Sequence, residues 1–380
     1  MPKKRRRLKA PIKATLRSIL EDYPGGQLLS EALQNAEDSG SRSFALMLDK
    51  RQHGGAVDER LAGPAFVLID DGSGLGEDEL ESLQNLQDSV KRDSPTQIGR
   101  YGMGSRSFFH YSDITTLVSR GAYVGLDPLY TVKSHGRDED GWEVSIDPSD
   151  CDGEEDAAVS AEARETFAIA VPNLCGSFNP TSSGAMFRLP LRRAHEVEKD
   201  GLGPEISVEK AEKMLCDWAE SLLDSRLLLF LSSVCEIKLL RWEDKAKEPT
   251  LVAQVSKHYA KGKSSPRLPS ALPDKACESF EGLQQHLDNL TSEERKELSR
   301  VHSSSVEIVA IDADAVASKT TWLVAQRFDA TSNSLRARIE ECGAVPVVGV
   351  AAQLVDPAGA AVEQAAAERQ TLRQEVAAAS

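Results

Sequence analysis

The sequence predicts an α/β protein in which helices and strands alternate along residues 12–240. Two observations carry this prediction. Apolar residues recur at helical spacing in residues 12–22 and 28–40. Short, strongly apolar segments at residues 43–48 and 65–69 have the length and composition of buried strands.

The helix expected at residues 28–40 carries one polar face. Glu31, Asn35 and Asp38 fall within an arc of roughly 60°, because a helix rotates by about 100° per residue. The apolar residues lie on the opposite side, and Gly40 fits the position that ends a helix in a left-handed conformation. The pattern fits either a surface helix with a solvated acidic face or a site for a metal-bound nucleotide.

The strand at residues 65–69 runs directly into a D-x-G-x-G motif. Asp70 follows the strand, with Gly72 and Gly74 after it and a helix expected at residues 77–86. Glycines at the end of a buried strand let a ligand approach the backbone. An ordinary strand-to-helix turn uses the same residue types, so the motif alone leaves both interpretations open.

A second glycine motif, G-x-x-G-x-G, consists of Gly99, Gly102 and Gly104 and precedes a helical stretch at residues 105–110. Such glycines let backbone N–H groups converge on phosphate oxygens, and the dipole of a following helix favours the negative charge. The motif is not a Rossmann fingerprint, because no buried strand precedes it, and it lacks the Gly-Lys-Ser/Thr of a Walker A loop.

The middle of the chain continues the α/β pattern. It predicts a β-hairpin, a further strand, a helix and two apolar strands, at residues 114–126, 184–192, 208–223, 227–231 and 235–240. One stretch departs from the pattern. Residues 137–165 hold twelve acidic residues against two arginines, which predicts a solvated acidic loop.

The last third of the chain, residues 241–357, predicts a smaller α+β segment. Residues 305–311 and 320–327 alternate like neighbouring antiparallel strands. Residues 243–303 show little periodicity outside a helical stretch near residues 280–290. Residues 358–380 are rich in alanine and predict a surface helix.

Composition narrows the class of protein. The 380 residues are 28% charged and 40% hydrophobic, as in ordinary soluble domains. No apolar run approaches the length of about 20 residues that spans a bilayer, so no membrane association is expected. The six cysteines are scattered, which argues against a zinc site and a disulfide scaffold and favours a reducing compartment.

The charge is distributed unevenly. The net charge is −15, although residues 1–13 contain seven Lys or Arg and no acidic residue. An acidic body repels phosphates, so we do not expect it to bind nucleic acid. Residues 1–11 predict a disordered basic head that either is a nuclear import signal or is only a charged tail, and no apolar segment of a secretory signal follows it. The expected location is therefore cytoplasmic or nuclear.

Three motifs in this order, E-x-x-x-N-x-x-D, D-x-G-x-G and G-x-x-G-x-G, resemble those of the GHKL ATPases. This superfamily contains gyrase-type topoisomerases, ninety-kilodalton heat-shock chaperones and histidine kinases. Within it, LLSEALQNAEDSG, DSVKRDSPTQIGRYGMG and GAMFRLPLR are most similar to sacsin-like proteins. The resemblance covers residues 12–240 well and runs thinly to about residue 355. It implies a two-layer Bergerat α/β sandwich, with a mixed sheet and helices on one face, followed by the smaller α+β segment.

The resemblance implies roles for the polar residues of the first motif. Glu31 would be the general base that orients the attacking water, and Asn35 would coordinate the Mg²⁺ bound to the phosphates. Asp38 would support the wall of the ATP pocket. Each role agrees with the chemistry of the side chain, since a carboxylate accepts a proton and an amide oxygen binds a hard cation.

The two glycine motifs complete the implied ATP site. Asp70 would accept the exocyclic amine of adenine, with Gly72 and Gly74 letting the base sit close. The glycines of residues 99–104 would cradle the phosphates and act as hinges for a lid. ATP and Mg²⁺ are therefore the expected cofactors.

Three residues depart from the family pattern. The family usually has Phe where this chain has Ser105, and Thr where this chain has Ala185. Asp88 stands in a lid segment that is more basic in the family. An aromatic wall and a hydroxyl near the adenine are therefore expected to be missing.

The expected function is slow, Mg²⁺-dependent ATP hydrolysis that couples lid closure to protein folding or remodelling. Client or co-chaperone proteins are the expected partners, together with nucleotide-dependent self-association. Two alternatives remain: a nucleotide-gated interaction module without turnover, and a nuclear, chromatin-associated GHKL ATPase. A histidine kinase is not expected, since none of the seven histidines lies in a phosphoacceptor helix.

Overall fold

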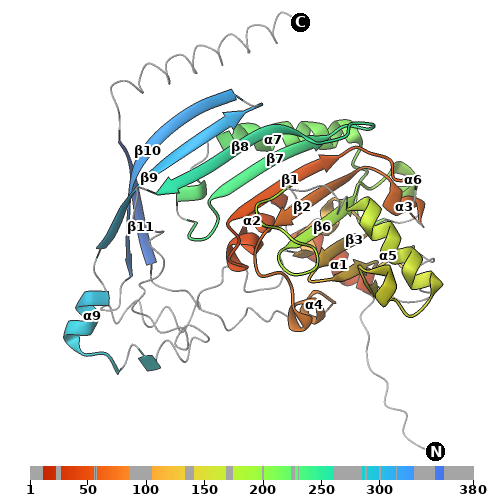
Figure 1. Cartoon of the computed structure of the whole chain (residues 1–380), viewed down its shortest axis with the longest axis horizontal. Coiled ribbons are helices and arrows are strands. Elements are labelled where there is room, and N and C mark those ends of the chain that lie inside the picture. The colour runs from red at the N-terminus through yellow and green to blue at the C-terminus, as the bar shows by residue number, and fades with distance from the viewer. Residues whose placement is uncertain are drawn as a thin grey trace, which may run out of the picture.

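In the part of the chain that this computed structural model describes, a sheet of eleven strands organises the fold (Figure 1). The structure describes residues 12–22, 27–54, 56, 58–84, 105–132, 141–167, 174–198, 201–223, 227–229, 231–259, 285–286, 289–298, 301–313, 315–328 and 347–354. The strand order is β11-β10-β9-β8-β7-β1-β2-β6-β3-β4-β5. The pair β1–β7 is parallel and the other neighbouring pairs are antiparallel, so the sheet is mixed, as expected.

The strands are β1 (Ser43–Asp49), β2 (Ala65–Asp70), β3 (Thr115–Ser119), β4 (Ala122–Leu126), β5 (Gly141–Ser145), β6 (Ala185–Pro190), β7 (Glu236–Trp242), β8 (Thr250–Tyr259), β9 (Val301–Asp312), β10 (Ala315–Phe328) and β11 (Val347–Leu354). The α-helices are α1 (Ile12–Asp22), α2 (Leu28–Asp38), α3 (Glu59–Ala62), α4 (Glu77–Gln84), α5 (Glu154–Thr166), α6 (Ala194–Glu198), α7 (Val208–Leu223) and α9 (Ser292–Leu298). Short 3₁₀ helices are η1 (Ser105–His110), η3 (Pro148–Asp150) and η4 (Leu227–Leu229).

The central strands are apolar on both faces because both faces are covered. In β1, Phe44, Leu46 and Leu48 join the larger core, which also contains the buried sides of α2 and α7. The alternate residues Ala45 and Met47 point into a second core on the opposite face. Side chains alternate across a strand, so the continuous apolar run follows directly from this double burial.

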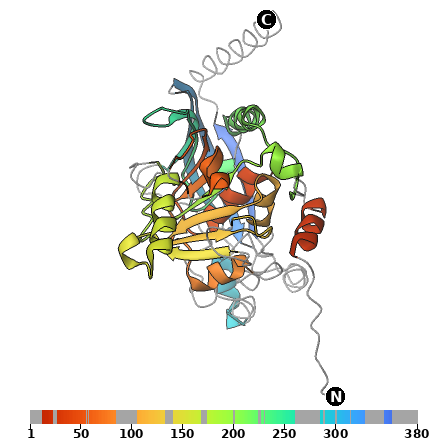
Figure 2. The same ribbon diagram turned by 90° about the vertical axis from the view of Figure 1, so that its right-hand side faces the viewer.

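Helix α5 corrects the expectation of an acidic loop at residues 137–165 and of helices on one face only. Strand β5, helix η3 and helix α5 occupy much of that stretch. Val159, Ala163 and Phe167 recur at intervals of four residues and fill the second core, opposite α2 and α7 (Figure 2). Acidic residues in the first turn of α5 favour the helix through its dipole. The high acidic content obscured this apolar stripe.

Some of the other predicted helices and strands are confirmed by the structure, and others are not. The expected helices at residues 12–22 and 208–223 and the strand pair β9–β10 are confirmed. Residues 227–229 form η4 and not a strand, and the long strand β8 lies in a segment where little periodicity was found. The helix expected at residues 358–380 and the basic head at residues 1–11 lie outside the described residues.

The sheet crosses the expected domain boundary without a break. Residue 240 lies inside β7, which pairs with β1 on one side and with β8 on the other. The division into residues 12–240 and 241–357 stays a prediction. No helix in the described part of the chain combines the length and the apolar character needed to cross a bilayer.

Candidate functional site

The candidate site lies at the centre of the sheet, where α2 leads into β1 beside the end of β2. Strands β1 and β2 are antiparallel, with Phe44 opposite Asp70. The connection from α2 to β1, residues 39–42, therefore runs past the last residue of β2. This topology brings the first two predicted motifs together.

Helix α2 ends as the sequence predicts. Gly40 has φ +74°, the left-handed conformation that glycine adopts without strain. The N–H of Gly40 donates to the carbonyl of Glu37 at 3.1 Å, and the N–H of Ser41 donates to the carbonyl of Ala36 at 3.0 Å. These two bonds form a Schellman motif, which satisfies the last carbonyls of the helix and turns the chain toward β1.

The polar face of α2 points away from the core, as expected. Leu28, Leu29, Ala32, Leu33 and Ala36 are the buried residues of the helix. The side chains of Glu31, Asn35 and Asp38 are half-buried. Glu31 and Asp38 both have interaction partners. The side-chain amide of Asn35 makes no hydrogen bond to any described residue, so it is available to a ligand.

The Asp70 carboxylate has its protein hydrogen-bond donors on one of its two oxygens. Its Oδ1 accepts hydrogen bonds from the N–H of Gly72 at 2.9 Å and from Ser41 Oγ at 2.8 Å, and Ser39 Oγ lies within hydrogen-bond distance of the same oxygen at 3.2 Å. The other oxygen, Oδ2, accepts no hydrogen bond from the residues that the structure describes. The carboxylate thus has one oxygen held by the protein and one oxygen open.

Burial and hydrogen bonding act in opposite directions on this carboxylate. Burial raises the pKa of Asp70 above its ordinary value of 3.8, and the nearby charge of Asp71 raises it further. The hydrogen bonds from Gly72, Ser41 and Ser39 lower it, and burial outweighs them. A carboxylate oxygen that has no hydrogen-bond partner in a largely desolvated place favours a ligand that brings a hydrogen-bond donor.

The two glycines of the D-x-G-x-G motif permit close packing of the chain on itself. A Cβ at Gly72 would lie 2.1 Å from Ser39 Oγ and 2.6 Å from Ser41 Oγ. A Cβ at Gly74, which has φ +75°, would lie 2.8 Å from Ser119 Oγ. Gly72 is therefore required so that the end of β2 can reach the end of α2.

Asp71 has a structural role next to the site. Its Oδ1 accepts the backbone N–H groups of Arg42 and Ser43, both at 2.8 Å, and its Oδ2 accepts the N–H of Ser177 at 3.1 Å. The side chain thereby links the start of β1 to the segment before β6. Of the two adjacent aspartates, Asp70 is the one with an open oxygen.

Ala185 lies directly across from Asp70 in the β2–β6 ladder. The hydroxyl that the family pattern would place here is absent, as expected from the sequence. Ser119 is the partner of Ala185 in the next strand, β3. Its Oγ donates to the carbonyl of Gly184 at 2.7 Å and accepts the N–H of Leu75 at 2.9 Å, so this hydroxyl holds the loop in place.

The phosphate side of the expected site is described only in part. Gly99, Gly102 and Gly104 lie outside the described residues, as does Asp88, and the description resumes at Ser105 with η1. The expected helix at residues 105–110 is thus a 3₁₀ helix.

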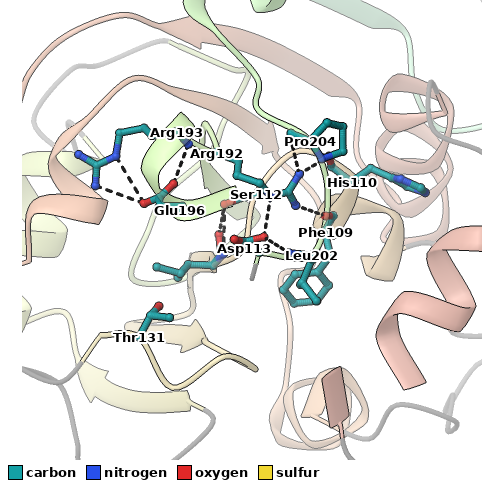
Figure 3. Close-up of polar contacts among 12 residues, drawn as sticks. Phe109, His110, Ser112, Asp113, Thr131, Arg192, Arg193, Glu196, Leu202 and Pro204 are labelled. Atoms are coloured by element: carbon teal, nitrogen blue, oxygen red, sulfur yellow. Dashed lines mark hydrogen bonds and ion pairs between the residues drawn. The ribbon is translucent and has the colours of Figure 1, made fainter. Parts of the chain in front are cut away.

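A buried arginine anchors the far end of η1 (Figure 3). Arg192 Nε lies 2.6 Å from Asp113 Oδ1. Its other nitrogens donate to the carbonyls of Phe109 at 2.6 Å, His110 at 3.1 Å and Pro204 at 3.0 Å. The segment that follows the glycine motif is therefore fixed to the strand end of β6.

Sequence reasoning missed the serines and Glu37. Ser39 and Ser41 flank the glycine that ends the helix, and only the fold places them on Asp70. Glu37 accepts the backbone N–H groups of Ser233 and Val234, both at 2.9 Å, and so ties α2 to the start of β7. The one usable signal was that serine stands on both sides of the helix-ending Gly40.

No group of three His, Cys, Asp or Glu side chains with metal-binding geometry occurs among the described residues. The amide oxygen of Asn35 is a kind of ligand that a hard cation such as Mg²⁺ can take alongside water and phosphate oxygens.

Comparison with known proteins identifies the family to which the chain belongs. The model of the sacsin domain matches residues 9–254, and the chain belongs to this family. The matched range is close to residues 12–240, where the sequence motifs resemble sacsin-like proteins.

Human sacsin is 26% identical to the chain over 359 residues. The alignment covers 90% of this chain and 7% of sacsin, so the chain spans a small part of that relative. Among solved structures, the crystal structure of the N-terminal domain of a DNA repair protein aligns with 84% of this chain and 71% of its own. Its TM-score is 0.33 and its sequence identity is 10%.

Proposed function

We propose that this chain is a GHKL-type module that binds ATP with Mg²⁺ and hydrolyses it slowly. The observation that carries the proposal is the open Oδ2 of Asp70 at the end of a central strand, next to the polar face of α2. An ionised carboxylate accepts hydrogen bonds only, so it recognises a donor such as the amino group of adenine. Asp70, Gly72 and Gly74 form the base side of the proposed site.

The polar face of α2 supports a nucleotide lying along the helix. Glu31, Asn35 and Ser39 follow one another at intervals of four residues, and Ser39 contacts Asp70. A helix rises about 1.5 Å per residue, so Glu31 lies about 12 Å from Ser39 along the axis. This spacing suits an extended nucleoside triphosphate, with its base at Asp70 and its phosphates near Asn35 and Glu31.

Each side chain then has a separate chemical task. The Asn35 amide oxygen would hold Mg²⁺, which when bound neutralises charge on the phosphates. The Glu31 carboxylate would orient a water molecule and accept its proton, and Asp38 would line the pocket. Gly99, Gly102 and Gly104 would bind phosphate oxygens through backbone N–H groups.

Protein folding or remodelling is the proposed use of this ATP cycle. The support is structural continuity, since β2, the strand that ends at Asp70, belongs to the sheet that extends through β1 and β7 into β8, β9 and β10. We expect a conformational change at the nucleotide site to be transmitted through this sheet to β8, β9 and β10. Client or co-chaperone proteins, and a second copy of the chain, are the proposed partners, in the cytoplasm or nucleus.

Paired binding and turnover measurements test the proposal. ATP with Mg²⁺ is titrated into the parent chain and the Glu31→Ala variant, and phosphate release is followed in the same samples. We expect both proteins to bind ATP and only the parent to release phosphate. Glu220→Ala, which removes an exposed carboxylate of α7, is the matched control and is expected to behave like the parent.

Two outcomes would change the proposal. Clear binding without turnover in the parent would replace the ATPase with a nucleotide-gated interaction module. Turnover of Glu31→Ala at the parental rate would remove Glu31 as the base.

A further inference from the structure

We propose that Ser39 and Ser41 are positioning residues for Asp70: their hydroxyls commit Oδ1 to the protein and leave Oδ2 as the oxygen that meets the ligand. This inference deepens the proposed function and rests on it for the identity of the ligand. The geometry of the two serines themselves is independent of any nucleotide.

The hydroxyl distances are compatible with a directional chain of hydrogen bonds from Ser39 through Ser41 to Asp70. Ser39 Oγ and Ser41 Oγ are 2.7 Å apart, and Ser41 Oγ is 2.8 Å from Asp70 Oδ1. A hydroxyl carries a single proton. When Ser41 donates its proton to Asp70, only Ser39 can be the donor between the two hydroxyls. Hydrogen bonds in such a chain polarise and strengthen one another, so Ser39 supports Asp70 partly through Ser41.

Ser39 also has other acceptors within reach. Its Oγ lies 2.9 Å from the carbonyl of Ala36 and 3.2 Å from Asp70 Oδ1. Ser39 can therefore donate directly to Asp70 when Ser41 is removed. The two serines are partly redundant, and their effects on Asp70 are expected to be non-additive.

The backbone completes the arrangement. The N–H of Gly72 donates to the same Oδ1 at 2.9 Å, and the N–H of Ser73 donates to the carbonyl of Ser39 at 3.0 Å. These bonds bring the loop after β2 against the end of α2. Because the donors among the described residues all lie at one oxygen, the rotation of the carboxylate is fixed and Oδ2 keeps a defined direction.

The burial of Ser41 makes its hydroxyl effective. Ser41 is fully buried, so water does not compete for its proton. The ionisable groups near Asp70 are Asp71, on the same loop, and the Cys175 thiol from the segment before β6, whose pKa is raised by burial and by the charges of Asp71 and Asp70. Neither group donates a hydrogen bond to Asp70. The serines and Gly72 are thus the groups that favour its ionised form.

The test combines the single variants Ser39→Ala and Ser41→Ala with the double variant. The first readout is the pKa of Asp70, followed by NMR of its side-chain carboxyl carbon in the ligand-free chain. We expect the pKa to rise in the double variant by more than in either single variant. Ser256→Ala removes a hydroxyl that contacts His258 on β8, away from Asp70, and is expected to leave the pKa unchanged.

The second readout is ATP affinity as a function of pH. We expect the double variant to bind ATP with Mg²⁺ at least about tenfold more weakly at neutral pH, since hydrogen bonds to charged groups are among the strong ones. Its loss of binding on acidification should begin at a higher pH than in the parent. A purely structural role for the serines would lower stability and leave this pH profile in place.

The two readouts separate this inference from the proposed function. A parent chain that does not bind ATP overturns the proposed function, and the Asp70 pKa still decides the role of the serines. An unchanged Asp70 pKa in the folded double variant overturns the inference. Parental ATP affinity of the double variant at every pH does so as well.

Discussion

Asp113 and Arg192 form a buried ion pair across 79 positions of sequence, with Arg192 Nε 2.6 Å from Asp113 Oδ1 (Figure 3). The same Asp113 oxygen accepts the N–H of Leu202 at 3.0 Å, and Arg17 donates to the carbonyl of Gly201 at 2.8 Å. The pair therefore joins α1, the end of η1 and the segment that leads into α7. It fixes the segment that follows the expected phosphate loop in the sequence.

Breaking this pair is expected to destabilise the chain strongly. Asp113→Asn keeps the shape and the acceptor for Leu202 but leaves the buried Arg192 charge without its carboxylate. The expected loss in free energy of unfolding is about 3–5 kcal/mol, because an uncompensated charge remains in the interior.

Urea unfolding of the full chain measures this loss. Arg193→Ala is the control, since it removes a partly exposed pair with Glu196 and is expected to cost about 0–1 kcal/mol. Equal losses for the two variants would show that the Arg192 pair contributes no more than a surface contact.

The lowered pKa of Asp49 predicts that the fold loses stability in acid. Burial opposes its ionisation, but hydrogen bonds from His53 and Arg51 and the charges of Arg51 and Arg188 outweigh burial and hold the pKa of Asp49 well below its ordinary 3.8. A lowered pKa contributes stability that is present above the unfolded value and is lost as the pH falls below it.

Asp49→Asn is therefore expected to cost about 3 kcal/mol at neutral pH, where it removes the buried carboxylate that pairs with Arg51 and offsets the charge of the buried Arg188. Its deficit relative to the parent should shrink as the pH falls below 3.8. Urea unfolding at several pH values measures both. A deficit that is constant across pH would contradict the assignment of the lowered pKa.

We expect loss of the Glu37 carboxylate to open the segment just before β7 locally. Its carboxylate accepts the N–H groups of Ser232, Ser233 and Val234. Glu37→Ala leaves these donors without their acceptor and is expected to cost about 2–3 kcal/mol, with Glu37→Gln intermediate, because it retains one oxygen.

Amide hydrogen exchange locates the effect of Glu37. The amides of residues 232–234 should exchange faster in Glu37→Ala than in the parent, while Glu220→Ala leaves them unchanged. Unaltered exchange at these amides would show that water replaces the carboxylate without loss.

We expect Asp70→Asn to affect the stability of the fold and the binding of ATP in opposite directions. Its raised pKa means that ionisation costs folding stability as the pH rises above 3.8 through the raised value. In Asp70→Asn, the amide oxygen can replace Oδ1 as the acceptor for Gly72, Ser39 and Ser41. This variant is expected to be at least as stable as the parent at neutral pH and to lose any advantage in acid. Thermal unfolding across pH measures this, and a clear loss of stability at neutral pH would be the contrary result.

The local parts of the fold could be predicted because their signals lie within short windows. The end of α2 at Gly40 and the buried strand that ends at Asp70 follow from periodicity and from glycine chemistry. Helix α5 was missed because its acidic residues outweighed the stripe of Val159, Ala163 and Phe167. Packing against the sheet stabilises this helix more than its composition suggests.

The part of the site that could not be predicted from the sequence depends on contacts between segments that are far apart in the chain. Ser39 and Ser41 meet Asp70 only because β1 and β2 are antiparallel neighbours. In the same way, Arg192 is one of several arginines in the sequence, and only the fold brings it to Asp113. A single sequence identifies the residue types of a site but does not show which groups hold them in place.

Titration calorimetry of the parent and Asp70→Asn with ATP and with inosine triphosphate, both with Mg²⁺, tests the central claim most directly. The two nucleotides differ in the group at position 6 of the base, an amino donor in ATP and a carbonyl acceptor in inosine triphosphate. The account predicts that the parent prefers ATP by at least about tenfold, because one misplaced hydrogen bond is worth this much. Asp70→Asn should lose ATP binding, since its amide presents a donor where the carboxylate accepted. Parental ATP affinity in Asp70→Asn, or no ATP binding in the parent, would contradict the account.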